Sequence, residues 1–410
     1  MPISMPTEAA IREEIKKGSA LSIVELVRHI LQYAHAVRAS DVHIDPAHGK
    51  LRVRMRIDGV LHENFSLPKN IHNEVISRVK VLAGLRTDEH QSAQDGRFRM
   101  DGGQDGAPLD VRVSIAPTYH GENAVLRLLA DTSALYTLES LGFRAPDREK
   151  ILRAIRTPNG MVLATGPTGS GKTTTLYTLV KLLNTPDISI VTIEDPIEYA
   201  IENIEQIQVN PRTGLTFAQG LRSILRQDPN IIMVGEIRDA DTAAIAVNAA
   251  LTGHLIFSTL HTSDTATTLP RLLDMKIEPY LIASTVTAVI GQRLVRQICD
   301  HCIMKHKLTD AEQESVRRVL GEAGVGPGGK FSKGKGCEAC ANTGYHGRIC
   351  VNEVLIVDDE IRDAIVRKTS AREIETIAIK NGMTTMLYDA FLKARAGLTT
   401  VEEVFRVIRE

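Results

Sequence analysis

The stretch Gly166-Pro167-Thr168-Gly169-Ser170-Gly171-Lys172-Thr173 decides the fold, because it follows the pattern G-x-x-x-x-G-K-[ST] of a phosphate-binding loop. An apolar run at 161–165 precedes it and has the composition of a buried strand. An amphipathic segment at 174–183 follows it and is long enough for a helix. In such a unit the glycines let backbone N–H groups turn toward phosphate oxygens, and the helix N-terminus adds partial positive charge. A chance glycine-rich turn is the alternative, and both flanking segments argue against it.

The loop residues have expected roles in binding ATP. Lys172 would reach the β- and γ-phosphates, and the Thr173 hydroxyl would hold Mg²⁺. The candidate nucleotide-binding residues of this stretch are Gly166, Pro167, Thr168, Gly169, Ser170, Gly171, Lys172, Thr173 and Thr174.

Length and composition exclude several classes of protein. The chain has 410 residues, which suggests two or three domains, and its 43% apolar and 24% charged residues are ordinary for a globular protein. A net charge of −1 gives no sign of a nucleic-acid-binding protein. No apolar run approaches the ~18 residues of a membrane span, and the N-terminus lacks a signal-peptide pattern. We therefore expect a cytoplasmic protein whose five cysteines serve metal binding or chemistry rather than disulfides.

Residues 20–130 predict a smaller α+β domain, preceded by a tail or remnant at 1–19 and followed by a linker at 131–148. Residues 51–57 alternate strictly between apolar residues and arginines, which predicts a half-buried strand, and Asp58-Gly59 then predicts a hairpin turn. Arginine-rich strands of this kind are more often solvated sheet faces than ligand sites.

Residues 149–298 alternate short apolar strands with helices, which predicts a parallel sheet with right-handed crossovers. Glu194 follows a predicted strand at 188–193, Glu236 follows one at 231–234, and His261 follows one at 255–258. Ligands of such sheets bind beyond the carboxyl ends of the strands, so these three residues are expected beside the phosphate-binding loop.

The two glutamates are the candidate catalytic acids. Glu236 would position Mg²⁺ through water or polarise the attacking water, and Glu194 is the other candidate to orient that water. The alternative for Glu194 is a strand-end acid that caps a loop. The alternative for His254 and His261 is local hydrogen bonding within loops.

Two C-x-x-C pairs predict a structural zinc site within 299–340. Cys299 and Cys302 form the first pair, and Cys337 and Cys340 form the second. Paired thiolates of this kind suit tetrahedral Zn²⁺. A redox disulfide and unpaired buried cysteines are the alternatives. The remainder, 341–410, predicts a helical subdomain, with four helices from Val351 onward.

Taken together, these motifs resemble those of the secretion ATPases of type II secretion and type IV pilus assembly, the GspE/PilB family. The loop as 165–177 is similar to that of the family, and so are the segments Ile193-Glu194-Asp195-Pro196-Ile197-Glu198-Tyr199, Met233-Val234-Gly235-Glu236-Ile237-Arg238-Asp239, Thr252-Gly253-His254 and Ser258-Thr259-Leu260-His261-Thr262. The segments Ser40-Asp41-Val42-His43-Ile44 and Gly121-Glu122-Asn123-Ala124-Val125-Leu126-Arg127 resemble the domain that precedes the ATPase core. The resemblance runs from about residue 20 to the C-terminus.

The resemblance implies a RecA-like P-loop domain preceded by a smaller, PAS-like α+β domain, in a homo-hexamer that binds ATP, Mg²⁺ and Zn²⁺. It implies a motor for pilin or pseudopilin assembly that works with inner-membrane platform proteins and contacts the membrane only through them. It further implies catalytic roles for Lys172, Glu194, Glu236, Arg112 and Arg127, and nucleotide contacts from Glu198, Arg222, Arg226, Arg238, His254, His261 and Arg271.

This chain departs from the family pattern in one respect. Members of the assembly branch usually carry a further N-terminal domain, and almost nothing precedes residue 20 here. A retraction, competence or conjugative-transfer motor is the alternative function. The cysteine pairs disfavour retraction, and the net charge of −1 disfavours DNA transport.

Overall fold

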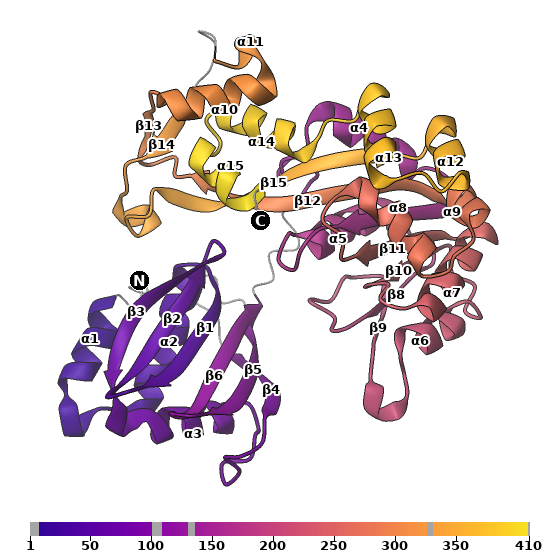
Figure 1. Cartoon of the computed structure of the whole chain (residues 1–410). Coiled ribbons are helices and arrows are strands. Elements are labelled where there is room, and N and C mark those ends of the chain that lie inside the picture. Colours follow the sequence, from indigo (N-terminus) through magenta and orange to yellow (C-terminus); the bar gives the residue numbers. More distant parts are fainter. Residues whose placement is uncertain (1–7, 101–108, 130–135, 326–330, 409–410) are drawn as a thin grey trace. The chain divides into compact units, whose positions relative to one another are not determined.

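The computed structural model describes residues 8–100, 109–129, 136–325 and 331–408. The chain divides into two compact units, Met1–Thr132 and Ser133–Glu410, which are described separately (Figure 1). No helix in the described ranges is both long and apolar enough to span a membrane.

The first unit is a six-stranded antiparallel sheet, ordered β3-β2-β1-β6-β5-β4, with helices packed on one face. Its elements are α1 (Glu8–Lys16), α2 (Ile23–Ala36), β1 (Ala39–Ala47), β2 (Lys50–Ile57), β3 (Val60–Pro68), α3 (His72–Leu82), β4 (Gln94–Met100), β5 (Leu109–Thr118) and β6 (Gly121–Leu129). The alternation predicted for 51–57 is present in β2, since Leu51, Val53 and Met55 are fully buried. On the opposite face Arg54 forms an ion pair with Asp45 at 2.8 Å, as expected of a solvated sheet face.

The second unit contains a seven-stranded sheet ordered β15-β12-β7-β11-β10-β8-β9. Its strands are β7 (Gly160–Thr165), β8 (Ile190–Glu194), β9 (Glu205–Gln208), β10 (Ile231–Val234), β11 (Leu255–Leu260), β12 (Val286–Ile298) and β15 (Tyr345–Ile356). Every neighbouring pair is parallel except β12 and β15. This arrangement confirms the predicted α/β class.

Helices cover both faces of this sheet, so its central strands are buried throughout. The helices are α4 (Ala145–Ala154), α5 (Lys172–Leu183), α6 (Phe217–Ile224), α7 (Ala240–Leu251), α8 (Thr265–Asp274) and α9 (Pro279–Thr285). Helices α4 and α5 contribute to the core on one face, and α6 to α9 contribute to the core on the other. The linker predicted at 131–148 lies outside the described residues at 131–135, and its last residues, from Ala145, belong to α4.

The helical prediction from Val351 onward is wrong for the first six residues, which belong to β15. Residues 350–355 of this strand are buried on both faces, and such a run does not show the alternation by which a strand is recognised. Four helices then follow, namely α12 (Asp359–Val366), α13 (Ala371–Lys380), α14 (Met386–Arg395) and α15 (Val401–Ile408).

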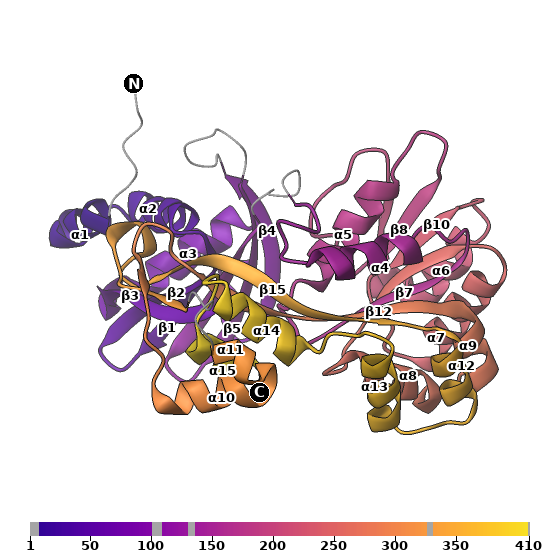
Figure 2. The same cartoon turned by 90° about the horizontal axis from the view of Figure 1, so that it is seen from above.

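Strands β12 and β15 form a long antiparallel ribbon, which extends past the sheet toward the cysteine segment (Figures 1 and 2). The segment between the two cysteine pairs contains β13 (Ile303–Lys305), α10 (Asp310–Leu320), α11 (Glu322–Val325) and β14 (Ser332–Gly334). Strands β13 and β14 pair with each other, and Val316 of α10 packs in one apolar cluster with Phe391 of α14 and Val404 of α15. The far end of the ribbon therefore has a core of its own.

Candidate functional site

The phosphate-binding loop joins the end of β7 to the start of α5, as its sequence predicts. Gly166, Gly169 and Gly171 have φ values of 140°, 79° and 90°, which favour glycine. A Cβ atom at Gly166 would lie only 2.3 Å from the main-chain oxygen of Gln292, so a side chain has no room there. Gly171 is the N-cap of α5 and supplies no side-chain cap, which leaves the first N–H groups of the helix available to an anion. The loop therefore fits the phosphates of a nucleotide.

Lys172 is held inside this loop. Its side chain is buried, and its Nζ donates hydrogen bonds to the main-chain oxygens of Gly166 at 2.8 Å and Pro167 at 3.0 Å. Burial lowers the pKa of Lys172 below its usual value, and the nearby Glu236 carboxylate opposes that shift. The ammonium group and the Glu236 carboxylate thus belong to one site.

Glu236 lies where β10 ends and forms the centre of a small polar cluster. Its Oε2 accepts hydrogen bonds from Nε of Arg238 and, at 3.2 Å, from Nε2 of His261. The Glu236 side chain is 10% exposed, whereas those of Arg238 and His261 are 67% and 44% exposed. The structure therefore brings together Lys172, Glu236, Arg238 and His261 at the carboxyl edge of the sheet, as predicted.

Glu194 also lies at this edge, but its carboxylate is fully engaged with protein groups. Its Oε1 accepts hydrogen bonds from Thr192 at 2.6 Å and Gln206 at 3.1 Å, and its Oε2 accepts one from the Tyr177 hydroxyl. Burial raises the pKa of Tyr177 well above its usual value, and Glu194 raises it further. These donors lie on β8, β9 and α5, so the carboxylate joins three elements, and a role in orienting water requires that these bonds open.

His254 lies at the wrong edge of the sheet to bind phosphate. It precedes β11, whose residue Leu255 pairs with Gly160 at the start of β7, whereas the loop follows the end of β7. Six residues of strand, about 20 Å, separate the two edges. The imidazole Nδ1 instead lies 2.9 Å from the main-chain oxygen of Ala249. The expected nucleotide contact from His254 is therefore corrected to the local hydrogen bonding that was its alternative.

The remaining candidates of this unit lie around the edge. Thr173 and Thr174 are half-buried in the first turn of α5. Arg222 forms an ion pair with Asp241 at 2.7 Å, and an Arg226 nitrogen donates to the main-chain oxygen of Arg222 at 2.8 Å. Glu198 follows β8, and its backbone hydrogen-bonds the Tyr177 hydroxyl. Arg271 is exposed in the last turn of α8, a helix that starts near the carboxyl edge and ends away from it.

Arg112 and Arg127 belong to the first unit, where they are direct cross-strand partners on β5 and β6. Arg127 is 59% exposed and forms an ion pair with Asp41 of β1 at 3.0 Å. Two other acids of this sheet pair with other cations: Asp110 lies 3.9 Å from Arg99, and Glu122 lies 2.7 Å from Lys80.

The four cysteines predicted to bind zinc converge, and their sulfur atoms lie within 4.8 Å of one another. Sulfur distances are 3.8 Å for Cys299–Cys337, 3.9 Å for Cys302–Cys340 and 3.7 Å for Cys337–Cys340. A tetrahedron with Zn–S bonds of ~2.3 Å has sulfurs about 3.8 Å apart, so the cluster fits Zn²⁺. These distances also exclude a disulfide within the cluster.

Backbone groups orient two of these sulfurs. The N–H groups of Gly336 and Gly344 donate to Cys302 and Cys340, each at 3.3 Å. Burial opposes ionisation of Cys340, but N–H donors from Cys337 and Gly344 outweigh it and lower the pKa of this thiol to about 7. The fifth cysteine, Cys350, is buried within β15.

Sequence reasoning missed two groups at the loop. Gln292 of β12 donates from Nε2 to the main-chain oxygen of Ser170 at 2.8 Å, and Thr165 donates from its hydroxyl to the main-chain oxygen of Thr262 at 2.9 Å. An amide directly after the apolar run at 288–291 was the available signal for Gln292. No local sequence pattern predicts a contact between Thr262 and Thr165, because Thr262 comes near β7 only through the pairing of β11 with β7.

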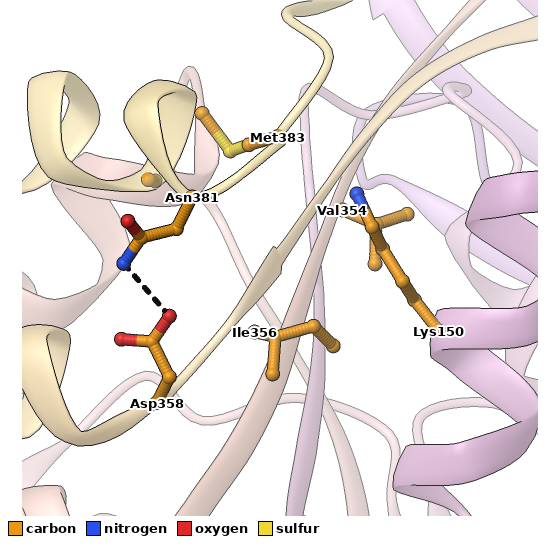
Figure 3. Close-up of a pocket in the computed structure, with 7 residues that line it drawn as sticks. Lys150, Val354, Ile356, Asp358, Asn381 and Met383 are labelled. Atoms are coloured by element: carbon orange, nitrogen blue, oxygen red, sulfur yellow. Dashed lines mark hydrogen bonds between the residues drawn. The ribbon is translucent and has the colours of Figure 1, made fainter.

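A small cavity lies elsewhere in this unit, where α4, β15 and α13 meet (Figure 3). Its volume of about 30 Å³ suffices for roughly one water molecule. Asn381 donates to Asp358 across its rim at 3.0 Å, and Lys150 donates to the main-chain oxygen of Gly382 at 2.8 Å. The cavity adjoins Ile356, which pairs with the start of β12, and is therefore remote from the phosphate-binding loop.

Comparisons with known proteins agree with this site. The family model described as type II/IV secretion system protein matches residues 16–406. The type IV pilus assembly ATPase PilB of Thermus thermophilus is 48% identical over 93% of this chain and 42% of its own length. Type II secretion system protein E of Xanthomonas campestris pv. campestris is 45% identical over 96% of this chain and 68% of its own length.

Two solved structures share the fold. The Legionella pneumophila ATPase DotB matches with a TM-score of 0.68 at 24% identity, over 92% of this chain and 93% of its own. The pilus retraction motor PilT, solved with bound ADP, matches with a TM-score of 0.62 at 26% identity, over 92% of this chain and 95% of its own.

Proposed function

Because the chain belongs to the type II/IV secretion system protein family, whose relatives are named as ATPases, we propose that it is the ATPase of a homo-hexameric motor. In this proposal the motor hydrolyses ATP to drive the assembly of pilins or pseudopilins. It works in the cytoplasm at inner-membrane platform proteins and reaches the membrane only through them.

One observation carries the proposal: Lys172 in the glycine loop after β7 and Glu236 after β10 both lie at the carboxyl edge of the sheet, where only β11 separates the two strands. A cation for the transferred phosphate and a carboxylate for metal or water are the two charges that phosphoryl transfer requires. The P-loop backbone and the α5 N-terminus would hold the phosphates, and Lys172 would leave its loop carbonyls for the γ-phosphate. Mg²⁺, when bound, neutralises charge on the β- and γ-oxygens. The Thr173 hydroxyl and Glu236, partly through water, are the residues that would hold it.

The surrounding residues would support this centre. Arg238 and His261 hold the Glu236 carboxylate in position through hydrogen bonds. Glu194 keeps the segment after β8 in place and would orient water once its bonds to Tyr177 and Gln206 open. Arg222, Arg226 and Arg271 are further candidates for nucleotide contact, within the subunit or across a hexamer interface. Zn²⁺ would have a structural role between the cysteine pairs, since each sulfur serves as a ligand and no open position is needed.

The names of the relatives favour the assembly of pilins or pseudopilins as the process that ATP hydrolysis drives. Relatives named for type IV pilus assembly are 43% and 48% identical to this chain, and those named for type II secretion are similarly close, whereas the retraction motor PilT is 26% identical.

Phosphate release by the purified chain tests the proposal. We expect Mg²⁺-dependent turnover of ATP that rises more steeply than protein concentration as hexamers form. Lys172→Ala should abolish turnover, because the γ-phosphate loses its point charge in the transition state. Lys181→Ala, at a half-buried position near the end of the same helix, is the matched control. Absence of turnover by a wild-type hexamer would refute an ATPase function.

A further inference from the structure

Gln292 on β12 is a buried amide in contact with the phosphate-binding loop. The residue is 1% exposed, and its Nε2 donates a 2.8 Å hydrogen bond to the main-chain oxygen of Ser170. Two loop glycines also approach it closely. A Cβ at Gly171 would lie 3.0 Å from the Gln292 amide nitrogen, and one at Gly166 would lie 2.3 Å from its main-chain oxygen. The loop therefore packs directly against Gln292 at both of these glycines.

Packing alone does not account for an amide at this position. The Oε1 atom of Gln292 is buried and accepts no hydrogen bond from any residue in the part of the chain that the structure describes. The preceding residues Val289 and Ile290 are fully buried and apolar. A methionine, of similar length, would fill the same space without a buried oxygen that lacks a protein donor. The amide thus contributes its N–H group, which donates a hydrogen bond to the loop.

The hydrogen bond fixes the direction of a peptide group. In a trans peptide the carbonyl and the N–H of the next residue point in opposite directions. Because the carbonyl of Ser170 points toward Gln292, the N–H of Gly171 points away from β12. Gly171 is the N-cap of α5, so its N–H is one of the groups that a phosphate at this helix terminus would meet.

We propose that Gln292 is a positioning residue for nucleotide binding, which holds the Ser170–Gly171 peptide group in the orientation that phosphate requires. This inference rests on the proposed binding of ATP. It assigns to β12, a strand outside the phosphate-binding motif, a direct part in shaping the loop. Gln292 acts through the loop backbone and does not itself contact the nucleotide.

Two substitutions separate the hydrogen bond from the shape of the side chain. Gln292→Met keeps the length and removes both polar groups, and Gln292→Glu keeps the shape and replaces the donor by an acceptor. The matched control is Gln297→Met, which makes the same replacement at a half-buried position of the same strand. ADP is the probe, and its dissociation constant is measured by calorimetry on the full-length protein. Thermal unfolding and hydrogen exchange are measured in parallel.

We expect Gln292→Met to bind ADP about tenfold more weakly, as for the loss of one buried hydrogen bond. Its unfolding temperature should stay close to that of the wild type, because the donor lost by Ser170 is offset by removal of the unpartnered Gln292 oxygen. Amide exchange should accelerate in peptides covering 166–173 alone. In turnover assays KM for ATP should rise by a similar factor while kcat changes little, because ground-state binding is what is lost. Gln292→Glu should bind at least as weakly, and Gln297→Met should behave as the wild type.

Wild-type affinity in Gln292→Met would overturn the inference, and so would a loss of affinity that follows a loss of stability. If Gln292→Met does not fold, Gln292→Asn keeps the amide but is one methylene too short to reach Ser170, and the same affinity comparison applies. Failure of the wild type to hydrolyse ATP would refute the proposed function, whereas the ADP measurement would still decide the role of Gln292.

Discussion

Glu194 and Glu236 have the same position relative to their strands and very different surroundings. Both come at the carboxyl end of a central parallel strand, so both were predicted as catalytic acids. Glu236 accepts from two exposed side chains, Arg238 and His261, whereas Glu194 accepts from three neutral protein donors. A motif therefore locates an acid at the site, but the partners that decide its role come from other elements. The nucleotide contact of His254 came only from the family resemblance, whereas the strand predicted at 255–258 already placed His254 before its start and His261 after its end.

The first prediction concerns Glu236. Glu236→Gln should retain ADP affinity while turnover falls by about 10²- to 10⁴-fold, because an amide cannot polarise the attacking water. Calorimetry and phosphate release measure the two quantities, and Glu278→Gln, which makes the same replacement at an exposed acid before α9, is the control. Equal losses of affinity and turnover would assign Glu236 to the structure of the loop rather than to chemistry.

The second prediction concerns Glu403, which joins α15 to β12. Burial would raise the pKa of this carboxyl, but hydrogen bonds from Arg406 and Arg296 outweigh burial and lower the pKa to about 2 from an ordinary 4.5. Ionised Glu403 therefore stabilises the fold above pH 4.5, and this contribution is lost as the pH falls from 4.5 toward 2.

Thermal unfolding of the wild type and of Glu403→Gln, measured over a range of pH, tests the direction of this pH dependence. The variant should be less stable than the wild type at pH 7, and the difference should shrink steadily below pH 4.5. Glu402→Gln changes the exposed neighbour and should leave the wild-type profile intact. A difference that stays constant down to pH 2 would show that the ion pairs do not contribute.

The elements of the nucleotide domain were largely predictable, because strand and helix alternate with clear boundaries between 149 and 285. Strands β12 and β15 were not. They pair across the 46 residues between Ile298 and Tyr345, and no local pattern reports such a pairing. The convergence of the cysteines was predictable from spacing alone, whereas their place at the end of this ribbon follows from the pairing. Glu353 illustrates the consequence, since its carboxylate accepts from the first residues of α8 and α14, Thr265 and Met386.

The third prediction concerns the cysteine cluster. We expect about one Zn²⁺ per chain by elemental analysis. Chelation or Cys337→Ser should accelerate hydrogen exchange at 299–302 and 336–345 while ADP binding survives, because the loop and the cluster lie in different parts of the unit. Cys350→Ser is the control for a cysteine outside the cluster. Metal-free protein with unchanged stability would contradict a structural zinc site.

At the scale of the whole chain, two units with separate cores have to cooperate for the proposed function. The first unit contains Arg112 and Arg127, which the family resemblance links to the nucleotide. In the structure Arg127 pairs with the buried Asp41 of its own sheet, so a role at the nucleotide requires that this pair exchange partners. Asp41 also lies 3.6 Å from Arg56, so its carboxylate keeps a cationic partner when Arg127 leaves. The family resemblance implies the roles of these arginines, and the pairing of β1 with β6 places Asp41 beside Arg127.

The fourth prediction follows from that competition. Arg127→Ala and Arg112→Ala should each lower turnover by about 10³-fold or more, as measured for arginines that stabilise phosphoryl transfer. Thermal stability should change little for Arg127, because the buried Asp41 carboxylate keeps Arg56 as a partner at 3.6 Å. Arg99→Ala removes an exposed arginine of the same sheet and is the control. Full activity of both variants would exclude these arginines from the reaction.

The ribbon of β12 and β15 has a mechanical consequence. Its last pairing with the sheet is Gly291 with Thr165, directly before the phosphate-binding loop, and Gln292 is the first residue beyond it. From there the two strands project for about 20 Å to the cysteine cluster. The ribbon is therefore a lever arm that is anchored in the sheet. It carries the four cysteine sulfurs at its tip, and the phosphate-binding loop lies at its base. A rotation of a few degrees at the base displaces the tip by an ångström or more, so the tip is where motion generated by the loop is largest.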